Sequence, residues 1–260
     1  MFNRSLQLKA IWLTKPVMRR VKIKKSNSLY NDFSGLLLLD KPPGITSFKA
    51  AHKIKKVLNV KKTGHCGTLD LAASGLLLIL IDKATKLQDK FMKKDKVYTS
   101  SFFLGTVTDS GDLDGNVISK MDIMNINIDK IKKAAKTFEG EISQIPPMHS
   151  ALKYKGKKLY ELARQGIEVE RSPRKITIEQ FNVLSYNGGI VKVTIKCSSG
   201  TYIRTLAYDL GNILGCGAAV KTLRREKIDI FDVKDALKFE DTDNIDMIKK
   251  KIIRYEELIK

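Results

Sequence analysis

The chain has 260 residues, 43% of them hydrophobic, and it carries 48 basic against 28 acidic side chains. The length is sufficient for a sizeable core, and the net charge of +20 favours a polyanion or an anionic membrane as partner, with a general lysine bias as the alternative. No apolar run reaches the roughly 20 residues of a membrane span, and three cysteines without a CxxC pair argue against a disulfide framework or a zinc site.

Residues 1–34 carry eight basic side chains, all of them before the first acidic residue, Asp32. Three interpretations are open: a disordered basic arm that contacts RNA backbone, a transit peptide, or a translation start that really lies at Met18. We favour a basic extension that the rest of the chain does not need.

The first half of the remaining chain alternates strand and helix signals. Residues 36–39 predict a short buried strand, which ends at the turn-forming Asp40-Lys41-Pro42-Pro43-Gly44. Thr46 or Ser47 can cap a helix over residues 48–58. The pattern then predicts a polar loop, a strand buried on both faces, a helix and an alternating strand, over residues 63–74, 75–81, 84–92 and 97–107.

The second half begins with a polar loop over residues 109–116, whose acids lack the glutamate and flanking helices of a calcium-binding EF-hand. It continues with an amphipathic helix, a hairpin turning at Asn187-Gly188-Gly189, a helix ended by glycines, a strand and a charged helical tail, over residues 126–138, 176–197, 202–214, 218–228 and 232–260. Strands and helices in no steady βαβ order predict an α+β fold.

The most informative segment is residues 64–75, which place one carboxylate, Asp70, in a loop of small residues before a buried strand. His65 lies five residues earlier, without a serine nucleophile nearby, so the pattern makes no catalytic triad. From the pattern alone, a structural loop with a capping aspartate is the favoured interpretation.

Residues 144–166 form a basic stretch in which Tyr154 and Tyr160 are interleaved. Such a stretch can follow phosphates while its aromatic rings meet bases, and a solvated helix face is an equally good interpretation. Its basic candidates for RNA contact are Lys153, Lys157 and Arg164.

Residues 64–75 resemble the catalytic loop of the TruB-type tRNA pseudouridine synthases, whose pattern is GHxGTLDPLATG. Further blocks resemble that family in the same order, namely GLLLLDKPPGITS, KVY with LGTVTD, QIPPMHSALKYKGKKLYELARQG, CSSGTYIRTLAYDL and GCGAAVKTLRR, and together they span residues 35–227. The resemblance implies the pseudouridine synthase fold, with a mixed, mainly antiparallel central sheet flanked by helices and loops. It also implies isomerisation of the T-loop uridine at position 55 of transfer RNA.

The resemblance assigns a role to each matching position. Asp70 is the catalytic carboxylate, Tyr98 stacks on the flipped uracil, and Arg204 pairs with the aspartate and orients it. His65 packs against splayed T-loop nucleotides, while Tyr202 and Leu223 line the uracil pocket. The reaction needs neither a redox cofactor nor a metal ion. The expected partner is the T arm of transfer RNA, without guide RNA or membrane, and the family predicts a cytoplasmic monomer.

Two departures from the family pattern stand out. Leu71 replaces the usual proline, a change that bears on loop rigidity more than on chemistry. Only about 30 residues follow Lys227, fewer than the bacterial family's C-terminal RNA-binding domain. We therefore expect a catalytic domain over residues 35–228, with an RNA-facing insertion at about 124–166, and a short helical tail over 229–260.

Two alternatives differ in function. In the first, the same fold binds and remodels transfer RNA without chemistry, although the intact set of Asp70, Tyr98 and Arg204 argues against this. In the second, the chain modifies another RNA with the help of a guide. A small-molecule enzyme is a poor third, because the chain has no phosphate-binding glycine motif and the charge of +20 would stay unexplained.

Overall fold

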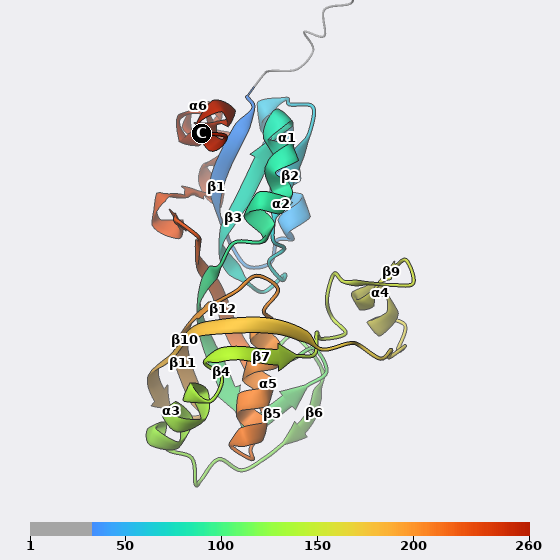
Figure 1. Ribbon diagram of the computed structural model, residues 1–260, viewed down its shortest axis with the longest axis vertical. Coiled ribbons are helices and arrows are strands. Elements are labelled where there is room, and N and C mark those ends of the chain that lie inside the picture. The colour runs from blue at the N-terminus through green and yellow to red at the C-terminus, as the bar shows by residue number, and fades with distance from the viewer. Residues whose placement is uncertain (1–32) are drawn as a thin grey trace, which may run out of the picture.

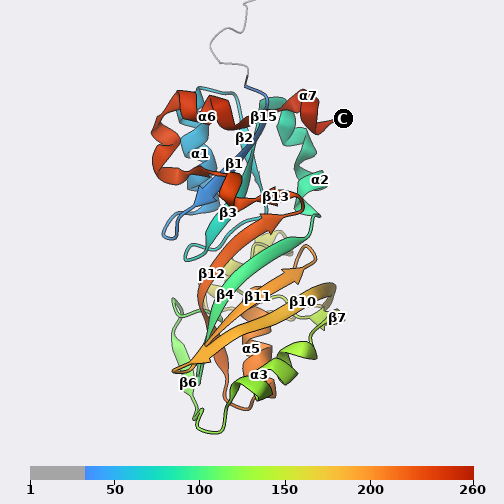
Figure 2. The same ribbon diagram turned by 90° about the vertical axis from the view of Figure 1, so that its left-hand side faces the viewer.

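One mixed sheet of eleven strands runs along the whole molecule (Figures 1 and 2). The computed structural model describes residues 33–260, and the basic extension predicted at the N-terminus lies outside the described residues except for its last two. The strands of the sheet are β1 (Gly35–Lys41), β2 (Thr63–Cys66), β3 (Ser74–Ile81), β4 (Lys96–Leu104), β7 (Gly140–Gln144), β10 (Arg174–Asn187), β11 (Ile190–Cys197), β12 (Ala218–Ile228), β13 (Phe231–Asp232), β14 (Leu237–Lys238) and β15 (Ile252–Arg254).

The strand order is β14-β1-β3-β12-β4-β11-β10-β7, with β2 beside β3, β13 beside β12 and β15 beside β1. Neighbours are antiparallel except for the parallel pairs β1–β14 and β3–β12. The predicted α+β fold with a mainly antiparallel sheet is therefore confirmed. Short two-stranded ribbons and helices complete the chain: β5 (Thr106–Thr108), β6 (Val117–Lys120), β8 (Lys153–Tyr154), β9 (Lys157–Lys158), α1 (Ser47–Leu58), α2 (Gln88–Met92), α3 (Ile128–Lys136), α4 (Leu159–Ala163), α5 (Ile203–Ile213), α6 (Ile245–Lys251), α7 (Tyr255–Leu258) and the 3-10 helices η1 (Asp82–Leu87), η2 (Val233–Asp235) and η3 (Phe239–Asp243).

The upper lobe in Figure 1 is built around β1 and β3, whose residues are almost all buried. Alternate side chains of the two strands enter two separate apolar clusters, one shared with α1 and the other with η1 and α2. A strand covered on both faces needs apolar residues at every position, which explains the uninterrupted leucine runs. Thr46 caps α1 by accepting a hydrogen bond from the Lys49 amide, as predicted.

The lower lobe is the other half of the sheet, with α3 and α5 packed against it (Figure 2). The β10–β11 hairpin turns at Asn187-Gly188-Gly189, as the sequence predicts. Strands β4 and β12 are long enough to extend from this lobe into the upper one, so they pass directly beneath the loop that precedes β3.

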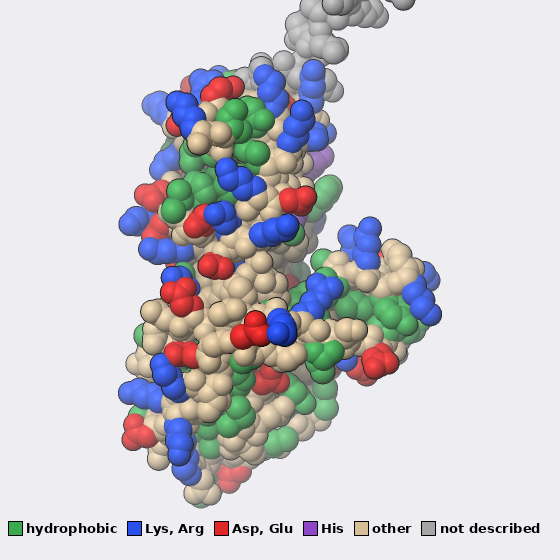
Figure 3. All heavy atoms as spheres, viewed as in Figure 1, with side chains coloured by type: hydrophobic (Ala, Val, Ile, Leu, Met, Phe, Trp, Pro, Cys, Tyr) green, Lys and Arg blue, Asp and Glu red, His purple; other side chains and the backbone are tan. Residues whose placement is uncertain are grey.

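A third, smaller lobe of β8, β9 and α4 projects from the side of the molecule (Figure 1). Within the predicted insertion of residues 124–166, α3 and β7 belong to the lower lobe, because α3 buries Ile131 and Ala135 and β7 pairs with β10. The segment after Gln144 is the part that projects. Figure 3 shows Lys and Arg side chains around this projecting lobe and over the upper lobe.

Several segments differ from the prediction. Strand β7 lies where no strand was expected, and it forms because β10 offers it an edge. Residues 63–66, expected as loop, form β2, which needs β3 as its partner. Residues 97–107 form two strands, because Gly105 adopts a φ of 81° and its amide bonds to Gly217 instead of extending the ladder. The tail, expected to be helical, also supplies β13, β14 and β15 to the main sheet, since its apolar side chains cover the edge of the upper lobe.

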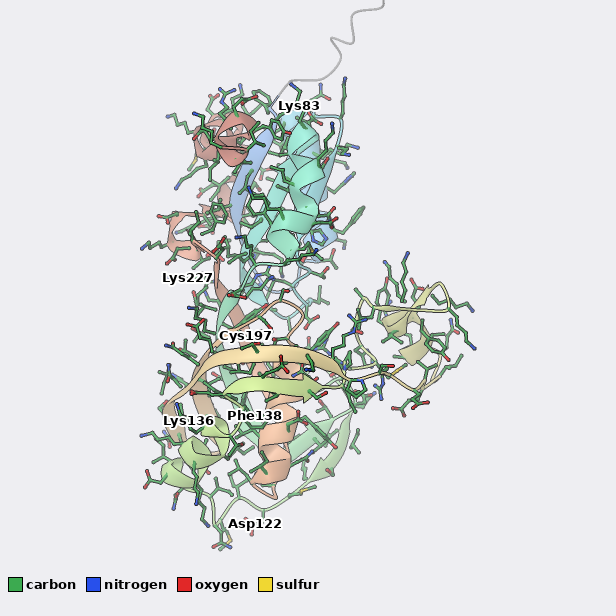
Figure 4. All side chains as sticks on the ribbon, in the orientation of Figure 1. Lys83, Asp122, Lys136, Phe138, Cys197 and Lys227 are labelled. Atoms are coloured by element: carbon green, nitrogen blue, oxygen red, sulfur yellow. The ribbon has the colours of Figure 1, made fainter. Side chains whose placement is uncertain are left out.

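The cysteines are free and buried, and burial raises the pKa of the Cys66 and Cys197 thiols to about 12. Figure 4 shows Cys197 at the level where the two lobes meet. Thiols this hard to ionise are poor nucleophiles. Among residues 33–260, no helix is long and apolar enough to cross a membrane, and no three His, Cys, Asp or Glu side chains gather as a metal site.

Candidate active site

The loop between β2 and β3 presents Asp70 at the junction of the two lobes. Ser47, at the start of α1, accepts a hydrogen bond from the Leu69 amide (2.9 Å) and donates one to the Leu69 carbonyl (3.2 Å). The Ala73 amide bonds to the Asp70 carbonyl, which closes a tight turn. Leu69 and Ala73 are buried on either side, while 44% of the Asp70 side chain is exposed. The loop therefore presents one accessible carboxylate between buried residues that fix its backbone.

Arg204, in the first turn of α5, grips that carboxylate with a two-point hydrogen bond. Its Nε lies 3.0 Å from Oδ2 of Asp70, and its second guanidinium nitrogen lies 3.4 Å from Oδ1. The remaining donors bond to the carbonyls of Ser110 (2.6 Å) and His149 (2.7 Å). The forked guanidinium thus fixes both the position and the rotation of the carboxylate, which a lysine could not do.

The carboxylate opens into a pocket that is partly open to solvent. Four of the residues singled out for substrate contact or catalysis line it with Asp70, namely Tyr98, Tyr202, Arg204 and Leu223; the other lining residues are Thr68, Leu69, Thr201 and Ile203. Tyr98 comes from β4 and Leu223 from β12, so the predicted set is assembled from distant parts of the chain. An aromatic ring, an aliphatic side chain and a carboxylate suit a flat base and its sugar.

Gln144, buried at the end of β7, places Tyr202 at the edge of this pocket. Its amide oxygen accepts from the Tyr202 amide (2.8 Å), and its amide nitrogen donates to the Tyr202 carbonyl (3.1 Å). Gln144 was not singled out from the sequence. Its one local signal is its place directly before Ile145-Pro146-Pro147, where the prolines make the chain turn.

Behind the pocket lies Arg225, a fully buried arginine that the sequence analysis also missed. It is the residue on β12 opposite Tyr98 on β4 and Gly75 on β3. Its guanidinium donates to the carbonyls of Leu76 (2.8 Å) and Gly67 (3.0 Å), and its positive charge partly offsets the rise that burial causes in the pKa of Tyr98. One buried residue therefore joins the base of the Asp70 loop to the strand that carries Tyr98.

Lys41 and Lys96 are two further buried cations close to Arg225. Lys41 donates to the carbonyls of Pro42 and Ile45, both at 2.8 Å, and Lys96 donates to those of Met92 and Lys94. Burial and then the charge of Arg225 lower the pKa of each lysine to about 8. Within residues 33–260, neither lysine nor Arg225 has a carboxylate within ion-pair distance, which makes the region beneath the loop strongly positive.

The pKa of Lys41 predicts how stability varies with pH. Because the folded-state pKa of about 8 lies below the usual lysine value of 10.5, the unfolded chain binds more protons between these values, and Lys41 makes folding more favourable as pH rises. Lys41→Met should remove this dependence. In urea unfolding, the free energy of unfolding of wild type should rise relative to that of Lys41→Met by about 2 kcal/mol between about pH 7 and pH 9.5. A difference that is constant with pH would contradict a depressed pKa.

His65 lies on β2 and does not line the pocket. Burial and the charge of Arg225 lower its pKa, so its imidazole is neutral at pH 7. Its Nδ1 is buried and has no hydrogen-bond partner among residues 33–260. The structure therefore brings the other predicted pocket residues together but leaves His65 beside them.

Lys153, Lys157 and Arg164 are exposed on the projecting lobe. The guanidinium of Arg164 lies over the ring of Tyr160, 5.5 Å from its centroid. The lobe is anchored close to the pocket, because His149, at its base, supplies a carbonyl to Arg204 and the Tyr160 amide bonds to the neighbouring Ser150 carbonyl. Its positive charge is thus attached to the same structure that orients Asp70.

Known proteins resemble this chain over most of its length. Residues 55–203 match the family model described as TruB family pseudouridylate synthase (N terminal domain), and residues 204–258 match the model for the tRNA pseudouridylate synthase B C-terminal domain. A protein of Endomicrobium trichonymphae named tRNA pseudouridine synthase B is 76% identical over 86% of this chain and 97% of its own length. One of the same name from Protochlamydia amoebophila is 46% identical over 85% and 84%.

Solved structures agree. A chain in the crystal structure of a Cbf5-Nop10-Gar1 complex is 31% identical with a TM-score of 0.68, over 86% of this chain and 61% of that one. A chain in a structure of an H/ACA RNP bound to a substrate RNA is 26% identical with a TM-score of 0.61, over 89% and 64%. This chain therefore spans about three fifths of the length of these solved chains.

Proposed function

The chain belongs to the TruB family of pseudouridylate synthases, and we propose that it isomerises the T-loop uridine, position 55, of transfer RNA. The name shared by the relatives from Endomicrobium trichonymphae and Protochlamydia amoebophila supports transfer RNA as the substrate. The net charge of +20 is complementary to a polyanion. The observation that carries the proposal is the Asp70–Arg204 pair in a pocket lined by Tyr98.

The reaction breaks the bond between ribose C1′ and uracil N1, turns the freed base, and joins C1′ to C5. The proton on C5 leaves and N1 gains one, so nothing is oxidised or reduced. In the proposed mechanism the Asp70 carboxylate attacks C1′ of the ribose or C6 of the uracil, or removes a ribose proton. Arg204 keeps the carboxylate turned toward the reacting nucleotide through its two-point contact.

A uridine within a folded loop must leave its stack before an enzyme can reach it. The proposed pocket receives the flipped uracil between the Tyr98 ring and the Leu223 side chain, with Tyr202 at the edge. Arg225, opposite Tyr98 across the paired strands β12 and β4, supports the ring from behind. His65, beside the pocket, would meet nucleotides next to the flipped one rather than the flipped base.

The projecting lobe is proposed to contact phosphates of the T arm, and this predicts a salt dependence. Replacing Lys153, Lys157 or Arg164 by Ala should each reduce the slope of log affinity against log salt by about one. Lys132→Ala, on α3 in the lower lobe, is the matched control and should leave the slope unchanged. A slope that none of the three substitutions changes would remove this lobe from the RNA-binding surface.

A second candidate function is modification of a different RNA within a protein complex. The likeness to a chain of the Cbf5-Nop10-Gar1 complex favours it, at 31% identity. The higher identity to the relatives named tRNA pseudouridine synthase B favours the first proposal. Binding and remodelling of transfer RNA without chemistry is the third, and it requires the Asp70–Arg204 geometry to serve no reaction.

The test is release of tritium from transfer RNA transcript labelled at C5 of its uridines, with purified protein and no guide RNA or cofactor. We expect one equivalent of tritium per transcript, because one C5 proton leaves per turnover. A transcript with cytidine in place of the T-loop uridine should release none. Release from that altered transcript would contradict the T-loop assignment, and tight binding without release from either would favour the non-catalytic alternative.

A further inference from the structure

The outer face of α1 carries an aromatic pair that the reaction described above does not use. Phe48 is 70% exposed, and its ring stacks on that of His52 with centroids 5.8 Å apart and planes 11° from parallel. The opposite face of the helix is buried through Ala50, Ala51 and Ile54, so neither ring is needed for the core. A phenylalanine this exposed leaves one face of its ring free for another flat group.

This pair lies close to the active-site loop. Ser47, the residue before Phe48, holds Leu69 by two hydrogen bonds, and Asp70 follows Leu69 directly. Consecutive Cα atoms are about 3.8 Å apart, so this path places the backbones of Phe48 and Asp70 within roughly 14 Å of each other. A second link joins the Gly44 amide to the Leu71 carbonyl at 2.8 Å. The aromatic pair therefore lies on an element joined directly to the loop that carries Asp70, outside the residues that line the pocket.

The charges on α1 itself are all positive. Four lysines and no acidic residue lie on α1. Lys53 is occupied by Asp243 and by the ring of Phe239, whereas Lys49 and Lys56 are exposed and have no ion pair within the described part of the chain. Because residues four apart share a helix face, Phe48, His52 and Lys56 form one continuous exposed strip.

We propose that Phe48, supported by His52, is a second base-stacking platform, which takes an unpaired nucleotide next to the flipped uridine. Lys49 and Lys56 contact the phosphates on either side of it. Aromatic rings and lysines interleaved on one surface suit single-stranded RNA, since every base offers a flat face and every linkage a negative charge. This inference rests on the proposed function for its substrate, and it adds a contact outside the catalytic pocket.

The first test compares Phe48→Ala with wild type on a T-arm stem-loop RNA. We expect about tenfold weaker binding, because the platform holds a base of the RNA. The single-turnover rate constant at saturating enzyme should change by less than about twofold, because that base does not react. The slope of log affinity against log salt should stay the same, whereas Lys49→Ala should reduce it. The control is Met124→Ala, which removes another highly exposed side chain, in the lower lobe. It should change neither the RNA affinity nor the rate constant nor the salt slope.

A second variant separates stacking from a general effect on folding. Phe48→Trp, made with Trp12 replaced by Phe so that only one indole is present, should bind RNA as wild type does. Its fluorescence should be quenched when RNA is added. The T-loop nucleotides are then replaced one at a time by abasic residues. At a single position, the abasic RNA should bind wild type more weakly than the normal RNA does, whereas Phe48→Ala should bind both RNAs equally.

Binding of Phe48→Ala within twofold of wild type, or an unquenched indole in the bound complex, would overturn the inference. These outcomes are distinct from failure of the proposed function. If wild type forms pseudouridine while Phe48→Ala binds normally, only the platform is wrong. If Phe48→Ala weakens RNA binding although wild type forms no product, the platform stands and the proposed reaction is wrong.

Discussion

Asp70→Asn is expected to lower single-turnover formation of pseudouridine by at least about 10⁴-fold, a loss typical of removing an enzyme's nucleophile. The amide has nearly the same shape as the carboxylate, but it has no negative charge with which to attack or to accept a proton. The loop should keep its form, because the Ser47–Leu69 bonds and the Ala73–Asp70 turn use backbone atoms of the loop. RNA affinity should therefore remain within about tenfold of wild type.

The control for this variant is Asp112→Asn. Asp112 also lies near Arg204, with an Oδ2–Nε distance of 3.8 Å, but its carboxylate does not line the pocket. A carboxylate that acts only through the local field should have a small effect, so we expect less than about a tenfold loss. Equal losses for the two variants would mean that charge near Arg204, rather than the Asp70 carboxylate, supports the reaction.

Arg204→Met is expected to lower kcat by about 10² to 10³-fold, the loss that follows when a group that orients the reacting carboxylate is removed. The carbonyls of Ser110 and His149 lose their donor at the same time, so the thermal midpoint should also fall. Arg204→Lys should recover part of the stability and little of the activity. A lysine keeps the charge but cannot hold both carboxylate oxygens at once.

Coupling between the two residues separates orientation from a general loss of structure. If Arg204 acts by orienting Asp70, the double variant Asp70→Asn, Arg204→Met should be no slower than Asp70→Asn alone. Losses that simply add would indicate an independent role for Arg204, such as a phosphate contact. Circular dichroism and RNA affinity of each variant identify any that have unfolded.

Strong periodic patterns predicted much of this fold. The leucine runs of β1 and β3, the capped helix α1 and the hairpin at Asn187-Gly188-Gly189 lie where the sequence places them, because burial and turn chemistry are local properties. Strands β2 and β7 and the three strands of the tail were missed. These are two to five residues long, and each exists because a neighbouring strand offers it an edge, which no local pattern records.

In the pocket, too, local sequence patterns do not show which distant residues come together. Asp70 and Arg204 are 134 positions apart, and only the family resemblance related them before the structure did. Arg225 could not be foreseen in the same way. It follows Arg224, which is paired with Asp40 near the surface, and nothing in two consecutive arginines tells which one is buried. The alternation of a strand requires them to face opposite ways, and the sheet decides which face is covered.

The roles proposed for Asp70 and for the T loop meet in one measurement. Enzyme in excess over an unmodified transfer RNA transcript, without guide RNA, is sampled through a single turnover, and pseudouridine is mapped by chemical derivatisation and sequencing for wild type and Asp70→Asn. We predict one new pseudouridine, at the T-loop uridine, with wild type only. Pseudouridine formed by Asp70→Asn at the wild-type rate, or formed only outside the T loop, would contradict the account.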